Sequence, residues 1–480
     1  MSNGFGKIKT LVKDTGLFAI STFGSQILVF LLTPLYTSIL ATEEYGIADL
    51  IFSTVVFVYP ILTLAISEAT LRFAIEKDEN KNKVFTNSIW FVIMSTLLLL
   101  ILTPALKYIY KGVSDYWLVF VGAYLFFNIH HVLSNFIKGI GKTKIYAAQG
   151  LIQTISIIIC NILFLVVFKW GLKGYLFSMY VGYIIPSIII IIAGRISQYS
   201  FPLAIDMALL KQMLRYCIPM IPTLVAWAIN ANIDKYMIIG FWGLGESGIY
   251  SVAHKIPTLM TTVLSVFTQA WQLSAISNYG DADEGDYYTN VYRNLNIVSV
   301  LGCFAIFFLT KPLSSFLFVN DYYIAWRFVP FLTLSALFSS NGGFISAAFK
   351  AAKKTNILFY TVLIGSLMNV ILNFILIQVI GTIGAAISTM VGFLVIWLFR
   401  MIMVQKIVKI KISVIRTTIS YISLIIAAAV LCFEIEQSYL IIVGLCCLTI
   451  IVNMSDIIGI LKKSKQIIKY IIARRNKNED

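Results

Sequence analysis

The stretch "GLKGYLFSMYVG" (residues 171–182) recurs in altered form as "GTIGAAISTMVG" (residues 381–392). Five positions are identical at an offset of 210 residues, and three of them are glycines. Two weaker matches occur in the same order: "YGIADL" (45–50) with "SGIYSV" (247–252) at an offset of 202, and "KGIGKTKI" (138–145) with "KAAKKTNI" (350–357) at 212. Together they predict an internal duplication, in which the two halves are parallel repeats related by an axis along the membrane normal.

The composition of the chain indicates that these halves lie in a membrane. Of its 480 residues, 59% are hydrophobic and only 12% are charged, and the mean hydropathy is +0.87. The apolar residues form runs of about 20, the length of a membrane-spanning helix. Short strands of alternating polarity, which a membrane β-barrel requires, are absent from the pattern. We therefore predict an all-α integral membrane protein.

Fourteen membrane spans are predicted, arranged as two six-helix bundles plus two C-terminal helices. We interpret residues 15–40 as the first span because this segment is too long for the apolar region of a signal peptide. The spans are 15–40, 46–75, 84–106, 116–137, 145–168, 174–194, 214–242, 247–276, 294–318, 324–349, 356–379, 382–405, 414–433 and 438–461.

The predicted domains follow from these spans and from the repeat. The N-lobe covers residues 15–194 and the C-lobe covers 214–405, with a cytoplasmic linker at 195–213 between them. Spans 13 and 14 occupy 414–461. Residues 1–14 and the basic tail 462–480 are expected to lie on the anionic cytoplasmic surface of the membrane as amphipathic segments.

The distribution of basic residues predicts the orientation. With the N-terminus inside, 29 of the 37 lysines and arginines fall in cytoplasmic segments and six in outside loops. An excess of this kind marks the cytoplasmic side. Both termini are therefore predicted to be cytoplasmic.

The loops offer no enzymatic chemistry, so we expect no catalytic residues, no cofactor and no metal. "GIGKT" (139–143) is not a nucleotide-binding loop because Phe136 stands where the first glycine belongs. The acidic loop 278–290 departs from the calcium-loop pattern at Gly285. The six cysteines all lie in apolar spans and are interpreted as packing residues. Neither a nucleotide nor a nucleic acid is expected as a partner.

Ionisable residues at membrane depth are candidates for function because burying them in lipid costs several kcal/mol. The sequence-based set contains Glu68 and Arg72 in the second span, Asp234 and Lys235 in the seventh, and Lys255 in the eighth. Their formal charges sum to +1, which favours an anionic substrate.

Two hypotheses remain open for this set. In the structural one, Asp234 pairs with Lys255, and Glu68 pairs with Arg72 one helical turn later. In the functional one, the cations face a cleft and bind an anion, and Asp234 tunes them.

Further polar residues in the spans extend the candidate site. His130 and His254 are candidates for proton coupling because histidine titrates near neutral pH. Amide side chains in the spans can hydrogen-bond either to sugar hydroxyls or to other helices. The candidates of this kind are Asn230, Asn232, Gln269 and Gln272.

Several stretches resemble the bacterial polysaccharide flippases of the multidrug/oligosaccharidyl-lipid/polysaccharide (MOP) exporter superfamily. "DKYMIIGFWGLGESGIYSVAHKI" (234–256) is similar to a family pattern that begins with an aspartate and a basic residue and ends in Gly-Ile-Tyr-Ser-x-Ala-x-Lys. "LATEEYGIADL" (40–50), "VNDYYIAWRFVPFLTL" (319–334) and "GTIGAAISTMVGF" (381–393) resemble other family segments in order. The resemblance covers essentially the whole chain.

The resemblance implies a flippase that moves undecaprenyl-diphosphate-linked oligosaccharides to the outer leaflet of the bacterial cytoplasmic membrane by alternating access. Such proteins serve the synthesis of O-antigen, capsule or teichoic-type polymers. Lys235, Lys255 and Arg72 would contact the diphosphate or acidic sugars, while Asp234, Glu68, His254 and His130 would tune charge or couple transport to a proton or sodium gradient. Anionic lipids and polysaccharide polymerases are the implied partners.

Two alternatives to this function are kept. One is a MATE-like multidrug exporter of the same superfamily, although organic cations call for an acidic cavity. The other is a non-enzymatic scaffold for glycan-assembly enzymes, which would not require charged residues at membrane depth. The absence of basic residues from span 15–40 argues against a peptidoglycan precursor, because lipid II flippases of the superfamily carry them there.

Overall fold

The computed structural model describes residues 23–76, 78–109, 115–199, 205–277, 283–460 and 462. Every regular element in these ranges is a helix, which confirms the predicted all-α membrane fold. The N-terminal segment 1–14 and nearly all of the basic tail 462–480 lie outside the described residues, so their placement on the membrane surface stays a prediction.

The chain forms two compact units, and each of them is built from three separate segments of the sequence. Unit 1 comprises Met1–Lys255, Phe316–Tyr323 and Asn373–Thr382. Unit 2 comprises Ile256–Ser315, Ile324–Leu372 and Ile383–Asp480. The predicted lobes are a division by repeat, and they stay a prediction.

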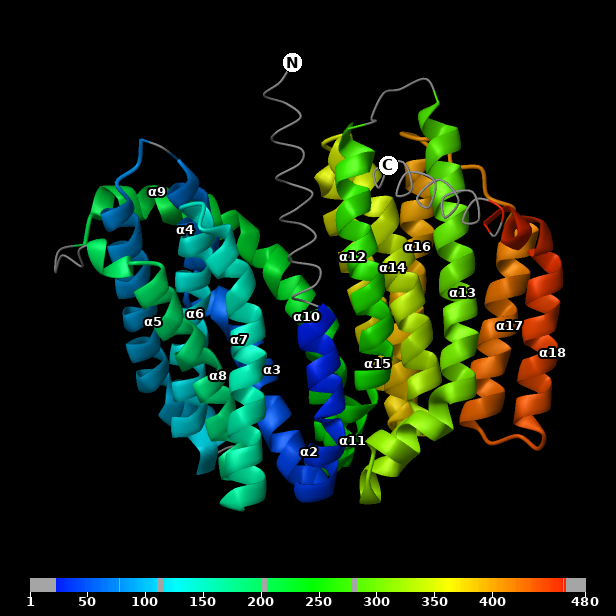
Figure 1. The fold of residues 1–480 in the computed structure, drawn as a ribbon, viewed down its shortest axis with the longest axis horizontal. Coiled ribbons are helices and arrows are strands. Elements are labelled where there is room, and N and C mark those ends of the chain that lie inside the picture. Colours follow the sequence, from blue (N-terminus) through cyan, green and yellow to red (C-terminus); the bar gives the residue numbers. More distant parts are fainter. Residues whose placement is uncertain are drawn as a thin grey trace, which may run out of the picture. The chain divides into compact units, whose positions relative to one another are not determined.

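The helices that contribute to unit 1 are α2 (Thr33–Ile39), α3 (Thr42–Leu62), α4 (Ile66–Ile75), α5 (Lys81–Ile109), α6 (Trp117–Gly139), α7 (Thr143–Asn161), α8 (Gly171–Ala193), α9 (Met207–Cys217), α10 (Ile221–Trp242) and α11 (Leu244–Ala253). The helices that contribute mainly to unit 2 are α12 (Lys255–Ser277), α13 (Glu284–Leu317), α14 (Val329–Ala351), α15 (Thr355–Ile380), α16 (Ile383–Val404), α17 (Val414–Cys432) and α18 (Ser438–Val452). Within unit 2, α17 and α18 pack side by side (Figure 1).

Ten of the described helices are long and apolar enough to cross a membrane, or up to twelve if two bent pairs each count as one span. The predicted count of fourteen is therefore not reached. The first predicted span is described only from Phe23, where an apolar helix runs to Ile39. The eighth, 247–276, is divided at His254 between α11 and α12.

Apolar packing holds the lower-numbered helices of unit 1 together. One buried cluster joins residues of α4, α5, α6 and α9, including Ile66, Val84, Val132 and Met213. The start of α9 is fixed by Asp206, whose carboxylate accepts hydrogen bonds from the backbone N–H of Leu209 (3.0 Å) and from the Lys83 ammonium (2.8 Å). These donors favour the ionised form and lower the pKa of Asp206 below its usual value.

Two glycines let α3 and α11 approach each other closely. A Cβ atom on Gly46 would collide with the carbonyl of Leu244, and one on Gly248 would collide with the carbonyl of Thr42. Small residues of this kind allow the backbones of membrane helices to pack in direct contact. Gly46 and Gly248 are matched residues of the predicted repeat, so the crossing brings equivalent parts of the two halves together.

The opening glycines of the two matched stretches also share a backbone conformation. Gly171 has φ +55° and Gly381 has φ +71°, the left-handed region that glycine adopts without steric cost. This local likeness agrees with the duplication, which as a whole stays a prediction.

Candidate functional site

A charged layer lies where α3, α10 and α11 meet in unit 1. Asp49 lies one turn after Gly46, on the α3 side of the glycine crossing. Its carboxylate forms an ion pair with Lys235 of α10, with 2.7 Å between Oδ2 and Nζ. The Ser251 hydroxyl of α11 donates to the same oxygen at 2.8 Å, and Lys235 also donates to the Ser53 hydroxyl at 3.3 Å. We call Asp49, Lys235, Asp234, His254 and Lys255 the charged layer.

Asp234 is buried and has neutral donors. The Tyr250 hydroxyl donates to Oδ2 at 3.0 Å, and the Asn373 side-chain amide donates to Oδ1 at 2.5 Å. The hypothesis that Asp234 pairs with Lys255 is therefore wrong. The hypothesis was based on the proximity of the two residues across the predicted hairpin. However, α10 directs successive residues to different faces: Asp234 points to Tyr250 and α15, and Lys235 points to α3.

Lys255 lies at the start of α12 and is half-buried. In the part of the chain that the structure describes, it has no carboxylate at ion-pair distance. It does interact electrostatically with Asp49, whose carboxylate also carries the Lys235 contact. The His254 ring lies edge-on against Tyr250, with 4.9 Å between ring centroids. Lys255 is thus the cation of the charged layer that the protein itself leaves without an ion pair.

Asp49 is the residue that sequence reasoning missed. It falls inside the predicted second span and inside the quoted stretch "LATEEYGIADL", so its depth could have been noticed. At the offset of 202 it also aligns with Ser251, the residue that now donates to it. With Asp49 added, the formal charges of the predicted set sum to zero rather than +1. Net charge therefore no longer discriminates between anionic and cationic substrates.

The predicted ion pair between Glu68 and Arg72 is also wrong. Arg72 pairs instead with Glu76, one turn further along, at 3.0 Å, and half of its side chain is exposed. Glu68 lies near the start of α4, directly after the break that ends α3, and it interacts electrostatically with Lys138 on α6. Glu68 and Arg72 both lie in α4 at a spacing of four residues, but Glu76 lies four residues on the other side of Arg72, and spacing alone does not reveal which of the two carboxylates Arg72 contacts.

The remaining predicted residues lie in different surroundings. His130 is buried, with 3.1 Å between Nδ1 and the Ser187 hydroxyl. Asn230 is buried, and Asn232 donates to the carbonyl of Ala228 in its own helix at 3.1 Å. In unit 2, Gln269 is exposed, and Gln272 accepts a hydrogen bond from Lys350 at 3.2 Å. Sugar binding by these amides stays a prediction.

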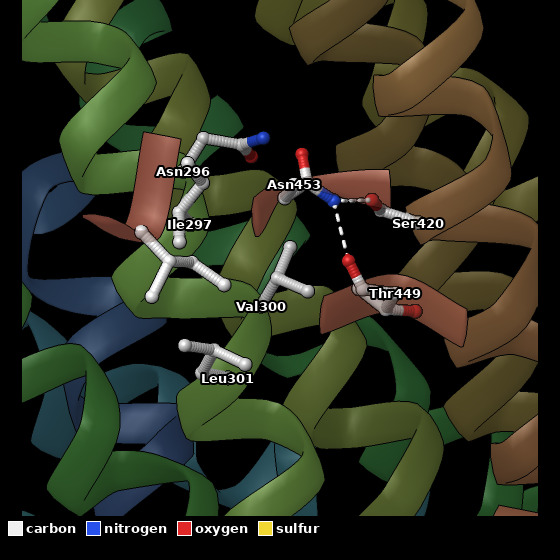
Figure 2. Close-up of a pocket in the computed structure, with 8 residues that line it drawn as sticks. Asn296, Ile297, Val300, Leu301, Ser420, Thr449 and Asn453 are labelled. Atoms are coloured by element: carbon white, nitrogen blue, oxygen red, sulfur yellow. Dashed lines mark hydrogen bonds between the residues drawn. The ribbon is translucent and has the colours of Figure 1, made fainter. Parts of the chain in front are cut away.

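A small polar cavity in unit 2 lies between α13, α17 and α18 (Figure 2). Asn453 donates to the Ser420 hydroxyl and to the Thr449 carbonyl, both at 2.9 Å. The water-accessible volume is about 10 Å³, room for one water molecule and far too little for a sugar. We interpret the cavity as part of helix packing. The described residues contain no group of three or more His, Cys, Asp or Glu side chains placed to hold a metal ion.

The fold and the charged layer together define a multi-pass, all-helical membrane protein with ionisable groups held at membrane depth. The model of the family described as "Polysaccharide biosynthesis protein" matches residues 11–272, more than half of the chain. The chain belongs to this family. It is also 24% identical, over 423 residues, to the uncharacterized membrane protein MJ1375 of Methanocaldococcus jannaschii, covering 83% of this chain and 99% of that protein.

Two solved structures support the predicted superfamily resemblance. The lipid II flippase MurJ in its inward closed conformation superimposes with a TM-score of 0.70 and 19% identity, covering 90% of this chain and 98% of that chain. An inward-facing multidrug resistance MATE family transporter of the MOP superfamily gives a TM-score of 0.65 and 15% identity, covering 81% and 98%. The fold is therefore that of a MOP-type transporter.

Proposed function

We propose that the protein moves undecaprenyl-diphosphate-linked oligosaccharides from the cytoplasmic to the outer leaflet by alternating access, for cell-surface polysaccharide synthesis. Membership of the polysaccharide biosynthesis family supports the glycan part of this proposal. The MOP-type fold supports transport rather than enzymatic chemistry. The proposed location is the cytoplasmic membrane, with polysaccharide polymerases and other assembly proteins as candidate partners.

The observation that carries the proposal is the state of Lys255. A half-buried ammonium without a carboxylate partner is costly at membrane depth, and an anionic ligand lowers that cost. A diphosphate offers several charged oxygens that hydrogen-bond strongly to ammonium groups. Lys235 binds the diphosphate together with Lys255 when the substrate replaces Asp49 as its partner. Asp49 holds Lys235 in place while the site is empty.

Asp234 is our candidate for coupling to a proton or sodium gradient. Its carboxylate is buried and accepts hydrogen bonds from the Asn373 amide of α15 and from the Tyr250 hydroxyl of α11. Glu68, His130 and His254 are further candidates. Arg72, which is paired with Glu76, stays a predicted substrate contact.

Replacement of the lysines tests the function. We expect Lys255→Ala and Lys235→Ala to reduce the export of lipid-linked glycan about tenfold or more, because each removes a charge-assisted hydrogen bond worth roughly 1.5–3 kcal/mol. Lys173→Ala, which removes an exposed lysine of α8, is the matched control. The measurements are glycan accumulation on the cytoplasmic face and protein abundance in the membrane. Repeating the assay with choline in place of sodium distinguishes the coupling ions.

The contrary outcome is equally specific. Deletion of the gene that causes no lipid-linked glycan to accumulate, but makes the cell sensitive to cationic dyes, would identify a drug exporter instead. The acidic groups Asp49 and Asp234 would then be the substrate contacts.

A further inference from the structure

Unit 2 contains a buried arginine that has only neutral acceptors. Arg400 lies near the end of α16 and is 6% exposed. Its Nε donates to the Thr361 hydroxyl of α15 at 3.1 Å, and its Nη1 donates to the Gly342 carbonyl of α14 at 3.0 Å. Among the described residues it has no carboxylate at ion-pair distance. The guanidinium is therefore held in a fixed position but its charge is not neutralised.

A second cation lies on α14, the helix whose Gly342 carbonyl accepts from Arg400. Lys350 is in the last turn of α14, and its ammonium donates to the side-chain carbonyl of Gln272 on α12 at 3.2 Å. The charges of Lys350 and Arg400 are close enough to repel each other. Lys350 is exposed, so a ligand can reach it, and two of its three N–H donors are not used in the contact with Gln272.

The other arginines described in unit 2 have acidic partners. Arg293 and Arg416 share Asp456, at 3.6 and 3.4 Å. Arg327 pairs with Glu434 at 2.7 Å. Arg400 is the exception among the four that the structure describes. Lys350 and Arg400 together carry two positive charges. The partial negative charges at the C-terminal ends of α14 and α16, roughly half a unit each, leave a net positive charge of about one.

The predicted repeat allows the surroundings of Lys350 to be compared with those of the matched lysine in unit 1. Lys350 is matched with Lys138 at the offset of 212, and Lys138 interacts electrostatically with Glu68 in unit 1. The matched lysines thus have different neighbours: Lys138 interacts with a carboxylate, whereas Lys350 contacts the neutral amide of Gln272. An amide in that place leaves the lysine charge available to an external anion.

We propose that Lys350 and Gln272, with Arg400 behind them, form a phosphate-binding site at the end of unit 2 that is predicted to be cytoplasmic. Gln272 donates through its amide nitrogen to the same anion, and Arg400 contributes positive potential without direct contact. The site takes a phosphate or diphosphate group. Its assignment to the lipid-linked substrate during loading rests on the proposed function, whereas its chemistry does not.

Binding of inorganic diphosphate tests the site. The full-length protein is placed in phosphatidylcholine nanodiscs, and affinity is measured by isothermal titration calorimetry. We expect Lys350→Gln and Gln272→Glu each to weaken binding about tenfold or more, since one removes the charge and the other supplies an internal carboxylate. Lys350→Arg should bind nearly as well as the natural protein. Gln272→Glu places a carboxylate against the Lys350 ammonium, a favourable contact, so loss of binding in this variant is not a result of unfolding.

Lys354→Gln is the matched control, because Lys354 is an exposed lysine in the turn that follows α14. Equal affinity of Lys350→Gln, Gln272→Glu and the natural protein would overturn the proposal, and so would equal weakening by Lys354→Gln. Nanodiscs that contain phosphatidylglycerol separate the sources of phosphate. Competition by this lipid that depends on Lys350 assigns the site to membrane phospholipid and rejects the substrate assignment.

A transport assay distinguishes failure of the site from failure of the function. If glycan export is normal in Gln272→Glu, the substrate assignment of the site is wrong while the flippase function stands. If diphosphate binding depends on Lys350 but the natural protein exports no lipid-linked glycan, the site stands and the proposed function is wrong.

Discussion

At the scale of single residues, the two lysines of the charged layer differ in what the protein gives them. Lys235 has Asp49 at 2.7 Å and the Ser53 hydroxyl at 3.3 Å. Lys255 has no carboxylate at ion-pair distance in the described structure. Sequence identified both lysines and their depth, because charged residues in apolar runs are conspicuous. It did not identify the partners of Lys235, because Asp49 and Ser53 come from α3, far away in the chain.

This difference predicts that the two lysines contribute differently to the stability of the protein. Lys235→Gln should lower the free energy of unfolding by about 2–3 kcal/mol, because it leaves the half-buried Asp49 carboxylate without its counter-charge. Asp49→Asn should cost a similar amount, and the double variant should cost little more than either one. Lys255→Gln should raise the free energy of unfolding or leave it unchanged, because it removes a half-buried charge that has no carboxylate partner. The measurement is thermal or denaturant unfolding of the purified protein in detergent. Additive losses in the double variant would contradict the coupling of Asp49 to Lys235.

At the scale of helices, hydropathy predicted where the chain is apolar but not where the helices break. Leu64 and Ala65 continue the apolar run between α3 and α4, yet both adopt the left-handed conformation, with φ 47° and 54°. Nothing in their side chains signals this break, because non-glycine residues reach that region only when tertiary packing holds them there. The error over Glu68 and Arg72 has another origin, because both residues lie within α4 and Arg72 has a second acidic residue, Glu76, four positions later.

Two lysines near the start of α8 test the cost of that conformation. Lys169 is exposed and has φ 54°, whereas Lys173 is exposed within the helix. Lys169→Gly should raise the free energy of unfolding by up to about 1 kcal/mol relative to Lys169→Ala, because glycine adopts positive φ without strain. Lys173→Gly should lower it by about 1 kcal/mol relative to Lys173→Ala. The alanine variants control for the lost charge. Thermal unfolding midpoints that move in the same direction at both positions would contradict the backbone assignment.

At the scale of the whole molecule, the fold class and family followed from composition, span length and a few ordered motifs, and the family is confirmed. The number of spans did not follow, because helices such as α11 and α12 are interrupted at polar residues that a hydropathy window averages away. The identity of the proposed glycan substrate does not follow from the sequence either. Recognition of a sugar depends on a few hydrogen bonds, and amides that could form them are also used between helices, as Gln272 is when its side-chain oxygen accepts from Lys350.

Orientation is the property of the whole molecule on which both proposals depend. The excess of basic residues on one side predicts that the turn after α14 is cytoplasmic and that the turn between α17 and α18 faces outward. Cysteine in place of Glu436 should therefore react with a membrane-impermeant maleimide in intact cells, while cysteine in place of Lys354 should react only after lysis. Cys446 and Cys447, which are not fully buried, are first replaced by serine. The reverse pattern would put Lys350 and Arg400 on the outer side, where they would meet the glycan at release rather than at loading.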